Sequence, residues 1–239
     1  MKKILSHCPW IIIDVGMIYF HREDEFKSLC REIILGAKTY ERLCGSRDRY
    51  VVIHFLRGLY TDFFKKYVEN MRIPIYEVPI QYFLSFFTRP LYLDPYAYDV
   101  FTSSDVWSHD VFIIGGIVDK PPRKRLTTVL VERCCPEISR KKIVLKGSVV
   151  GVPPEINSVT EIILKTLLYD DVEKAIKDTM SKRDAMIRAY YELVKRRRYI
   201  KTIDDVKNIY EELSRWLNLD EITFRRSLKR AGIPRELWI

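Results

Sequence analysis

Amide side chains are scarce in this sequence, and glutamine occurs at a single position, Gln81. Ile, Lys, Arg and Glu are abundant instead, a bias that is common in proteins of thermophiles. Long hydrophobic runs are also missing, because no apolar stretch approaches the roughly 18 residues that a membrane-spanning helix requires. Nothing in the chain resembles a secretory signal peptide. These absences predict a cytoplasmic protein with no membrane partner.

The sequence also lacks the common fingerprints of nucleotide-binding and hydrolytic enzymes. No G-x-G-x-x-G follows the first apolar run and no G-x-x-x-x-G-K-[ST] occurs, which argues against a conventional dinucleotide site and a P-loop. There is no G-x-S-x-G elbow of a serine hydrolase. The four histidines, His7, His21, His54 and His109, are dispersed and form no H-E-x-x-H motif. No metal site is therefore predicted.

The cysteines show no recognisable disulfide or metal-binding pattern. The residues are odd in number, and no pair has the spacing of a zinc ribbon or of a redox motif. They are Cys8, Cys30, Cys44, Cys134 and Cys135. Free buried thiols in a reducing cytosol are therefore expected.

Charge and length indicate the class of partner and the number of domains. The 239 residues suit one domain with a small appendage, and 47% of them are hydrophobic, enough for a sizeable core. The net charge is +9 and the pI is near 9.2, which favours a polyanionic partner such as nucleic acid. Most of the positive net charge lies in residues 173–239.

Apolar runs alternate with stretches of helical periodicity in the first three quarters of the chain. Strands are expected at 10–15, 50–56, 73–78, 91–94, 111–116 and 141–146, and helices at 23–43, 62–71, 126–134 and 156–168. Such alternation predicts an α/β fold with a mostly parallel sheet and helices on both faces.

Beyond about residue 172 the expected strands stop. Residues 172–199 read as one helical stretch, Thr202 and Asp205 form a capping box for a helix to Leu217, and a last helix runs from Asp220 to Gly232. The predicted domains are therefore 1–172, an α/β domain, and 173–239, a small, basic, all-helical tail.

The segment after the 111–116 strand combines features that suggest chemistry on nucleic acid. Gly115 and Gly116 end the strand, Asp119 follows, and the basic stretch Lys120–Arg125 comes next. Ligands of open α/β sheets bind beyond the carboxyl ends of strands, so a cofactor, a proton acceptor and a polyanion can meet there. The alternative is a tight turn, a capping or surface acid, and a solvated loop.

Two other segments carry candidate binding groups. The loop between the 141–146 strand and the following helix exposes backbone groups that can hold the polar edge of a ligand, although Asn157 or Ser158 can equally cap that helix. In the tail, Lys195–Arg198 end a helix, where the macrodipole by itself favours cations. Tyr190, Tyr191 and Tyr199 nearby can stack on bases or belong to the core.

These segments together resemble the SPOUT superfamily of knotted methyltransferases, and specifically the archaeal type of tRNA methyltransferase that modifies N1 of the purine at position nine. The resemblance covers roughly residues 10 to 170. It depends above all on Phe112–Lys120, and it is supported by Ile143–Lys146, Asn157–Leu164, Ile12–Val15 and Leu91–Asp94.

The resemblance implies a SPOUT fold with a C-terminal trefoil knot, S-adenosyl-L-methionine as cofactor, tRNA as partner and a monomeric state. It makes Asp119 the candidate catalytic base. It assigns cofactor binding to Leu93, Gly115, Gly116, Val118, Leu145, Lys146, Pro153, Ile156 and Asn157. The expected RNA-binding residues are Lys120, Arg123, Lys124, Arg125, Lys195, Arg196, Arg197 and Arg198.

The chain departs from the family at one point of that motif. Members commonly follow the acid with Lys-Asn-Arg, whereas Pro121 and Pro122 replace the last two residues here. Any tRNA contact made there must move to Arg123, Lys124 or Arg125.

The expected reaction is methyl transfer to N1 of the purine at position nine, with adenosine favoured and guanosine left open. Two alternatives stand beside it. One is a catalytically silent RNA-binding SPOUT protein. The other is a DNA-binding regulator that uses Arg225, Arg226, Lys229 and Arg230 of the tail in a helix-turn-helix arrangement.

Overall fold

The computed structural model describes residues 5–53, 62, 64, 66, 68, 72–118, 125–145, 148 and 150–239. They form two compact units. We call Met1–Ile143 together with Pro154–Asp171 the sheet unit, and Val144–Pro153 together with Val172–Ile239 the helical unit. The helical unit thus includes the loop 144–153, which the sequence pattern alone assigns to the α/β domain.

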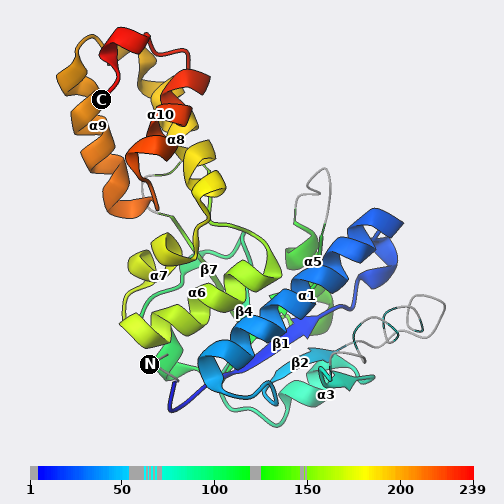
Figure 1. The fold of residues 1–239 in the computed structure, drawn as a ribbon. Helices are drawn as coiled ribbons and strands as arrows, with labels where there is room; N and C mark the ends of the chain where they lie inside the picture. The colour runs from blue at the N-terminus through cyan, green and yellow to red at the C-terminus, as the bar shows by residue number, and fades with distance from the viewer. Residues whose placement is uncertain are drawn as a thin grey trace. The chain divides into compact units, whose positions relative to one another are not determined.

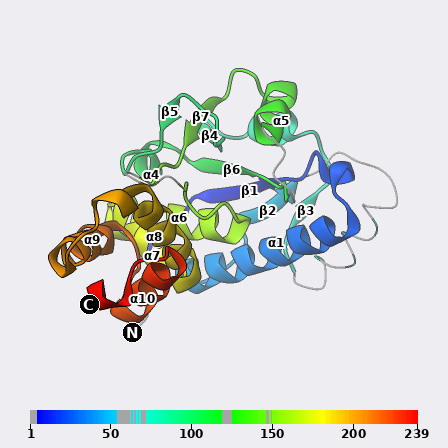
Figure 2. The ribbon, with the colours of Figure 1, turned by 90° about the horizontal axis from the view of Figure 1, so that it is seen from above.

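The described part of the sheet unit contains a seven-stranded sheet in the order β3-β2-β1-β6-β4-β7-β5, and all its strand pairs are parallel (Figures 1 and 2). The strands are β1 (Trp10–Asp14), β2 (Tyr50–Ile53), β3 (Ile75–Tyr76), β4 (Pro90–Leu93), β5 (Asp99–Val100), β6 (Val111–Gly115) and β7 (Ser139–Lys142). The predicted parallel α/β sheet is confirmed.

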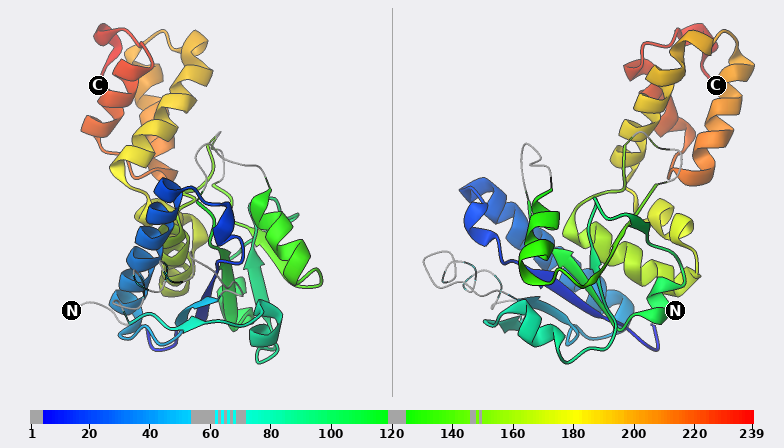
Figure 3. Two further views of the ribbon diagram at one scale, coloured as in Figure 1. Left: turned by 90° about the vertical axis from the view of Figure 1, so that its right-hand side faces the viewer. Right: turned by 180° about the vertical axis from the view of Figure 1, so that it is seen from behind.

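Helices cover both faces of this sheet. Figures 2 and 3 show α1 (Glu23–Cys44) and α6 (Ile156–Tyr169) on one face and α5 (Leu126–Cys134) on the other. The unit also contains η1 (Ile18–Phe20), α3 (Ile80–Leu84) and α4 (Asp105–Ser108).

The core follows from the apolar runs of the central strands. Ile11, Ile12 and Ile13 of β1 are all fully buried, because both faces of the strand are covered. On the face that α3 and α5 cover, Ile12 packs in one cluster with Tyr92 and Val131. Burying a side chain of this size contributes about 1.5–3 kcal/mol, so β1 and its neighbours hold much of the unit's stability.

Two local features of the sheet unit differ from the sequence pattern. Strand β7 ends at Lys142, short of the predicted residue 146, because its partners β4 and β5 offer no paired residue beyond that point. Helix α6 is not capped by Asn157 or Ser158. Its N-cap is Glu155, which makes no side-chain cap bond.

The helical unit contains four α-helices among its described residues: α7 (Val172–Thr179), α8 (Lys182–Arg196), α9 (Ile203–Trp216) and α10 (Glu221–Arg230), with short turns η3 (Arg197–Tyr199) and η4 (Arg235–Leu237). The helical prediction for 172–199 is confirmed, but the stretch is divided at Met180 and Ser181 into α7 and α8. Ser181 accepts a bond from the Asp184 amide and starts a new helix there. The capping box of Thr202 and Asp205 is confirmed.

The loop 144–153 is attached to α8 by a buried arginine. The Arg188 side chain is 4% exposed, and its Nε donates to the Gly151 carbonyl at 2.9 Å. Its Nη1 donates to the Asp184 carbonyl at 3.2 Å. A buried guanidinium has to be hydrogen-bonded, so this contact fixes the loop to the helix.

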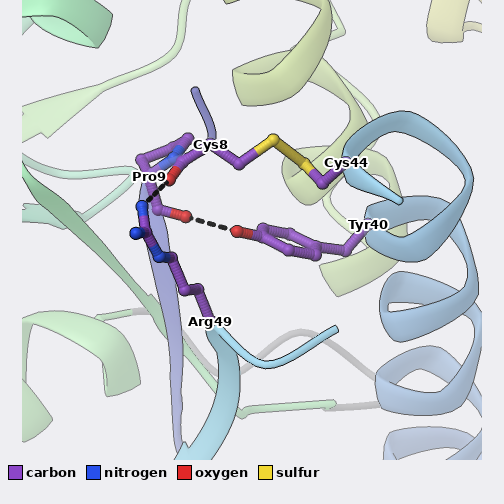
Figure 4. The surroundings of a disulfide bond; sticks show 5 residues. All are labelled: Cys8, Pro9, Tyr40, Cys44 and Arg49. Atoms are coloured by element: carbon purple, nitrogen blue, oxygen red, sulfur yellow. Dashed lines mark hydrogen bonds between the residues drawn. A yellow bond between two sulfur atoms is a disulfide. The ribbon is translucent and has the colours of Figure 1, made fainter. Parts of the chain in front are cut away.

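The cysteine prediction is wrong for one pair. Cys8 and Cys44 form a disulfide that joins the segment before β1 to the end of α1 (Figure 4). Beside it, the Tyr40 hydroxyl donates to the Pro9 carbonyl at 2.7 Å, and Arg49 donates to the Cys8 carbonyl at 2.9 Å. The remaining thiols, Cys30, Cys134 and Cys135, are free.

The sequence missed the bridge because its spacing of 36 residues follows from the length of the β1–α1 unit, not from a motif. Within the described residues, none of the helices is both long enough and apolar enough to span a bilayer.

Candidate active site at the carboxyl edge of the sheet

The topology of the sheet indicates where a ligand binds. The chain runs from β1 to β2 and β3 in one direction, then crosses to β4 on the other side, and β6 lies between β1 and β4. Asp14 is paired with Gly115, and Leu93 with Ile114, so the carboxyl ends of these three strands lie at one edge. In open α/β sheets ligands occupy the crevice outside such a reversal of strand order.

Packing against neighbouring residues of the protein accounts for the two glycines at the end of β6. The Gly116 amide donates to the Asp14 carbonyl at 2.7 Å, and a Cβ on Gly116 would lie 2.5 Å from Val15 Cγ1. A Cβ on Gly115 would lie 3.1 Å from Thr127 Cγ2. Glycine therefore permits close packing of β6 against β1 and α5. The pair does not by itself indicate a bound ligand.

Asp14, at the end of β1, is a buried carboxylate that the sequence pattern did not single out. It is 2% exposed, its Oδ1 accepts from the Gly16 amide at 2.9 Å, and its Oδ2 accepts from the Tyr92 hydroxyl at 3.1 Å. Burial raises its pKa to about 6, and the two hydrogen bonds oppose that rise only in part. Asp14 therefore titrates close to neutral pH.

Asp94 follows β4 at the same edge. Its Oδ1 accepts from the Tyr96 amide at 2.9 Å and from the Thr128 hydroxyl at 3.0 Å. Its Oδ2 is buried and has no hydrogen-bond partner in the described part of the structure. A buried, unsatisfied carboxylate oxygen is costly in a folded protein, so this atom is a natural acceptor for a ligand donor.

His21 contacts the loop that follows β6. The ring is 5% exposed, and its Nε2 accepts a hydrogen bond from the Val118 amide at 2.9 Å. Its Nδ1 lies 3.1 Å from the Ile18 carbonyl. No sequence pattern predicts this contact, because His21 stands 97 residues before Val118.

A cavity of about 370 Å³ opens beside Asp14, between α3 and α5. Its wall is mainly apolar, with Asp14, Gln81 and Arg133 as polar members. The lining residues are Asp14, Gly16, Met17, Ile53, Val78, Pro79, Ile80, Gln81, Leu130, Arg133 and Cys134. None of the predicted cofactor residues lines it.

The predicted cofactor residues are distributed over both units. Leu93, Gly115, Gly116 and Val118 lie at the carboxyl edge, and Ile156 and Asn157 open α6, all in the sheet unit. Leu145 and Pro153 belong to the loop of the helical unit. Lys146 and the candidate base Asp119 lie outside the described residues, as do Lys120, Arg123 and Lys124.

Of the basic stretch before α5, the structure describes Arg125. It has a left-handed backbone with φ of 67°, and its guanidinium lies 5.8 Å from the centre of the Tyr96 ring. Tyr96 is 51% exposed, so the pair presents a cation and an aromatic surface at the carboxyl edge.

The four basic residues at the end of α8, Lys195–Arg198, differ in their exposure and partners. Arg196 donates two bonds of 2.6 Å to Glu212, which raise the pKa of the guanidinium and lower that of the carboxyl. Lys195, Arg197 and Arg198 are exposed. Arg196 therefore joins α8 to α9, and its three neighbours are accessible to solvent.

Aromatic side chains accompany these cations. Tyr191 is 46% exposed and Tyr199 is 80% exposed, whereas the Tyr190 ring is covered by the guanidinium of Arg230 at 4.9 Å. Arg225 lies 3.8 Å from Glu221. Two of the four cations needed by the helix-turn-helix alternative are thus engaged inside the unit.

Comparison with known proteins identifies relatives along almost the whole chain. No protein-family model matches it. A tRNA (adenine(9)-N1)-methyltransferase of Sulfolobus acidocaldarius is 38% identical over 97% of this chain and 73% of its own length. A tRNA (guanine(9)-/adenine(9)-N1)-methyltransferase of Thermococcus kodakarensis is 28% identical over 99% of this chain and 66% of its own length.

A solved structure is similar in fold as well as in sequence. Sulfolobus acidocaldarius Trm10 in complex with S-adenosylhomocysteine has a TM-score of 0.65 and 26% identity, and the match covers 94% of this chain and 68% of that one.

Proposed function

The chain belongs to the family of tRNA methyltransferases that modify N1 of the purine at position nine, and we propose on that premise that adenosine is its main target. It transfers the methyl group of S-adenosyl-L-methionine to that nitrogen. The observation that carries this conclusion is the 38% identity over 97% of the chain with a relative of that activity. The preference for adenosine is supported by the same relative, which is named for adenine alone.

The carboxyl edge has acceptor chemistry that fits the cofactor. S-adenosyl-L-methionine supplies an electrophilic methyl group on a sulfonium and carries hydroxyl and amino donors. Asp94 Oδ2, which has no partner among the residues that the structure describes, would accept from one of these donors. Backbone groups of Gly115–Val118 would hold the remaining polar groups, together with Leu93, Ile156 and Asn157 of the same unit. Leu145, Lys146 and Pro153 are proposed as cofactor contacts on the family resemblance alone.

Asp119 is the proposed proton acceptor. Adenine N1 has a free lone pair and can attack directly, whereas guanine N1 carries a hydrogen that must leave. A carboxylate next to N1 would take up that proton or stabilise the positive charge that develops on adenine. Positioning of nucleophile and methyl carbon in line supplies most of the rate.

The tRNA contacts are assigned to exposed cations and aromatic rings of each unit. In the sheet unit these are Lys120, Arg123, Lys124 and Arg125. In the helical unit Lys195, Arg197 and Arg198 would bind phosphates, and Tyr191 and Tyr199 would stack on unpaired bases. Arg196 is set apart, because a phosphate contact would have to compete with Glu212.

The finer features of the family complete the proposal. Membership in the SPOUT superfamily supports a trefoil knot in the carboxyl part of the 1–172 domain, with 173–239 as an RNA-binding helical region. A monomer acting in the cytoplasm, where tRNA is found, is proposed on the same basis.

The deciding experiment is methyl transfer from radiolabelled S-adenosyl-L-methionine to two tRNA transcripts that differ only in A or G at position nine. Identification of the labelled nucleoside as N1-methyladenosine on the first transcript, with a slower reaction on the second, is expected. Equal rates on both would contradict the adenosine preference. No transfer to either, with cofactor binding absent, would indicate a silent RNA-binding protein.

A further inference from the structure

Two buried hydrogen bonds attach the loop after β6 to the segment after β1. The Gly116 amide donates to the Asp14 carbonyl at 2.7 Å, and the Val118 amide donates to His21 Nε2 at 2.9 Å. Val118 is 8% exposed. The bond between Val118 and His21 lies beyond the end of β6 at Gly115, so it holds a part of the loop that is not paired in the sheet.

Two partners of the ring, Val118 and Ile18, indicate which nitrogen accepts and which donates. Val118 presents an N–H, which can only donate, so His21 Nε2 must carry the lone pair. The Ile18 carbonyl can only accept, so the hydrogen is on Nδ1. The contact with Val118 therefore requires the tautomer that has its hydrogen on Nδ1 and its lone pair on Nε2.

We propose that His21 is a positioning residue for the methyl transfer, which rests on the proposed role of Val118 in holding the cofactor. Val118 is the last described residue of the loop after β6, so the bond from His21 holds the loop backbone at that point. Val118 is also one of the proposed cofactor contacts. If a reacting group is displaced by about 1 Å, the rate can fall about a hundredfold. Loss of the bond at Val118 is therefore expected to slow the methyl transfer.

Alternative explanations for the contact predict different behaviour. A purely structural His21 would stabilise the β1–η1 segment through the Ile18 carbonyl, and its loss would change stability without changing the chemical step. A positioning His21 acts through Nε2 and the Val118 amide. The two nitrogens can be tested separately.

Two substitutions test the roles of the two ring nitrogens of His21 separately. In His21→Asn the side-chain amide can donate to the Ile18 carbonyl at the place of Nδ1, but it cannot reach the Val118 amide. In His21→Gln the side-chain oxygen lies near the place of Nε2 and can accept from Val118. Both replacements are polar and close in size to the original, which makes them matched variants.

The primary measurement is the single-turnover rate of methyl transfer with enzyme in excess over A9 tRNA. His21→Asn should lower this rate at least about tenfold, and His21→Gln should stay within about threefold of the wild type. Dissociation constants for tRNA should change less than about twofold in both. Hydrogen exchange at the Val118 amide should be slow in the wild type and His21→Gln, and faster in His21→Asn.

The outcomes separate this proposal from the function on which it rests. Equal rates for His21→Asn and the wild type, or equal losses in both variants, would overturn the positioning role while leaving the methyltransferase intact. If the wild type methylates neither transcript, the proposed function fails and the positioning role fails with it. If His21→Asn does not fold, a fast-exchanging Val118 amide in the wild type, or a tenfold loss in a folded His21→Gln, would overturn the proposal.

Discussion

The Glu32 carboxylate of α1 accepts a hydrogen bond from the Ile156 amide at the start of α6, at a distance of 3.1 Å and a sequence separation of 124 residues. Free amides at a helix start need an acceptor, and α6 has no capping side chain of its own. A residue from a neighbouring helix therefore caps α6. The same contact orients Ile156 and Asn157, which are proposed to hold the cofactor.

Removal of this cap should destabilise the sheet unit. Glu32→Ala should cost about 0.5–2 kcal/mol of unfolding free energy, the usual range for loss of a capping acceptor. Glu32→Gln keeps an oxygen that can accept and should lose less. Urea denaturation of both variants tests this, and equal losses would show that charge, not hydrogen bonding, is what matters at Glu32.

The disulfide should contribute measurable stability. Cys8→Ser should lower the unfolding free energy of the oxidised protein by about 2–4 kcal/mol, because the cross-link restricts the unfolded chain. Reductant should bring the wild type to the level of the variant and leave the variant unchanged. Alkylation of the unfolded protein without reductant should label Cys30, Cys134 and Cys135 alone. Labelling of all five cysteines under oxidising conditions would show that the bridge does not form.

Asp14 should make stability fall as pH rises. Its pKa is raised from 3.8 to about 6 in the folded state, so the native protein holds the proton more tightly than the unfolded chain. Stability is greatest below pH 3.8 as far as this group is concerned, declines between about pH 4 and 6, and is lowest above that window. The penalty at pH 7 is about 2–3 kcal/mol.

Asp14→Asn should remove that part of the pH dependence. The amide oxygen can still accept from Gly16, and the variant should gain stability relative to the wild type as pH rises from 4 to 7. Thermal unfolding at several pH values measures the difference. A constant difference across the range would mean that Asp14 does not titrate there.

The basic cluster of α8 should separate into RNA contacts and a structural ion pair. Lys195→Ala and Arg198→Ala should each weaken tRNA binding and lower the slope of log affinity against log salt by about one. Arg196→Ala, the matched control, should instead lower the stability of the helical unit, because it leaves Glu212 unpaired. Equal loss of affinity in all three variants would contradict this division.

The proposed base should affect chemistry more than binding. Asp119→Asn should leave tRNA affinity nearly intact and lower the single-turnover rate by about 10²–10⁴-fold on a guanosine-9 transcript, the usual range for general base catalysis. The loss should be smaller with adenosine at position nine, because its N1 carries no hydrogen. An unchanged rate on both transcripts would remove Asp119 from this role.

Local features of the fold could be predicted from the sequence. The apolar runs of β1 and β6 identify buried strands, the helix Leu126–Cys134 is periodic, and Thr202 with Asp205 signals a helix start. Each depends on residues that are neighbours in the chain, where periodicity and capping chemistry act directly. The family could also be recognised from the sequence, because the segment around Gly115 and Gly116 is specific to it.

The sequence by itself thus determined the parallel α/β architecture and the family, and it predicts a site at the carboxyl edge of the sheet. The tertiary structure alone decided which distant groups meet: Cys8 with Cys44, Glu32 with the Ile156 amide, and His21 with the Val118 amide. These contacts join residues 36 to 124 positions apart, and their partners are mostly backbone amides, which every residue but proline possesses. No sequence pattern marks such an amide, because only the packing of the helices and the order of the strands bring it to its acceptor.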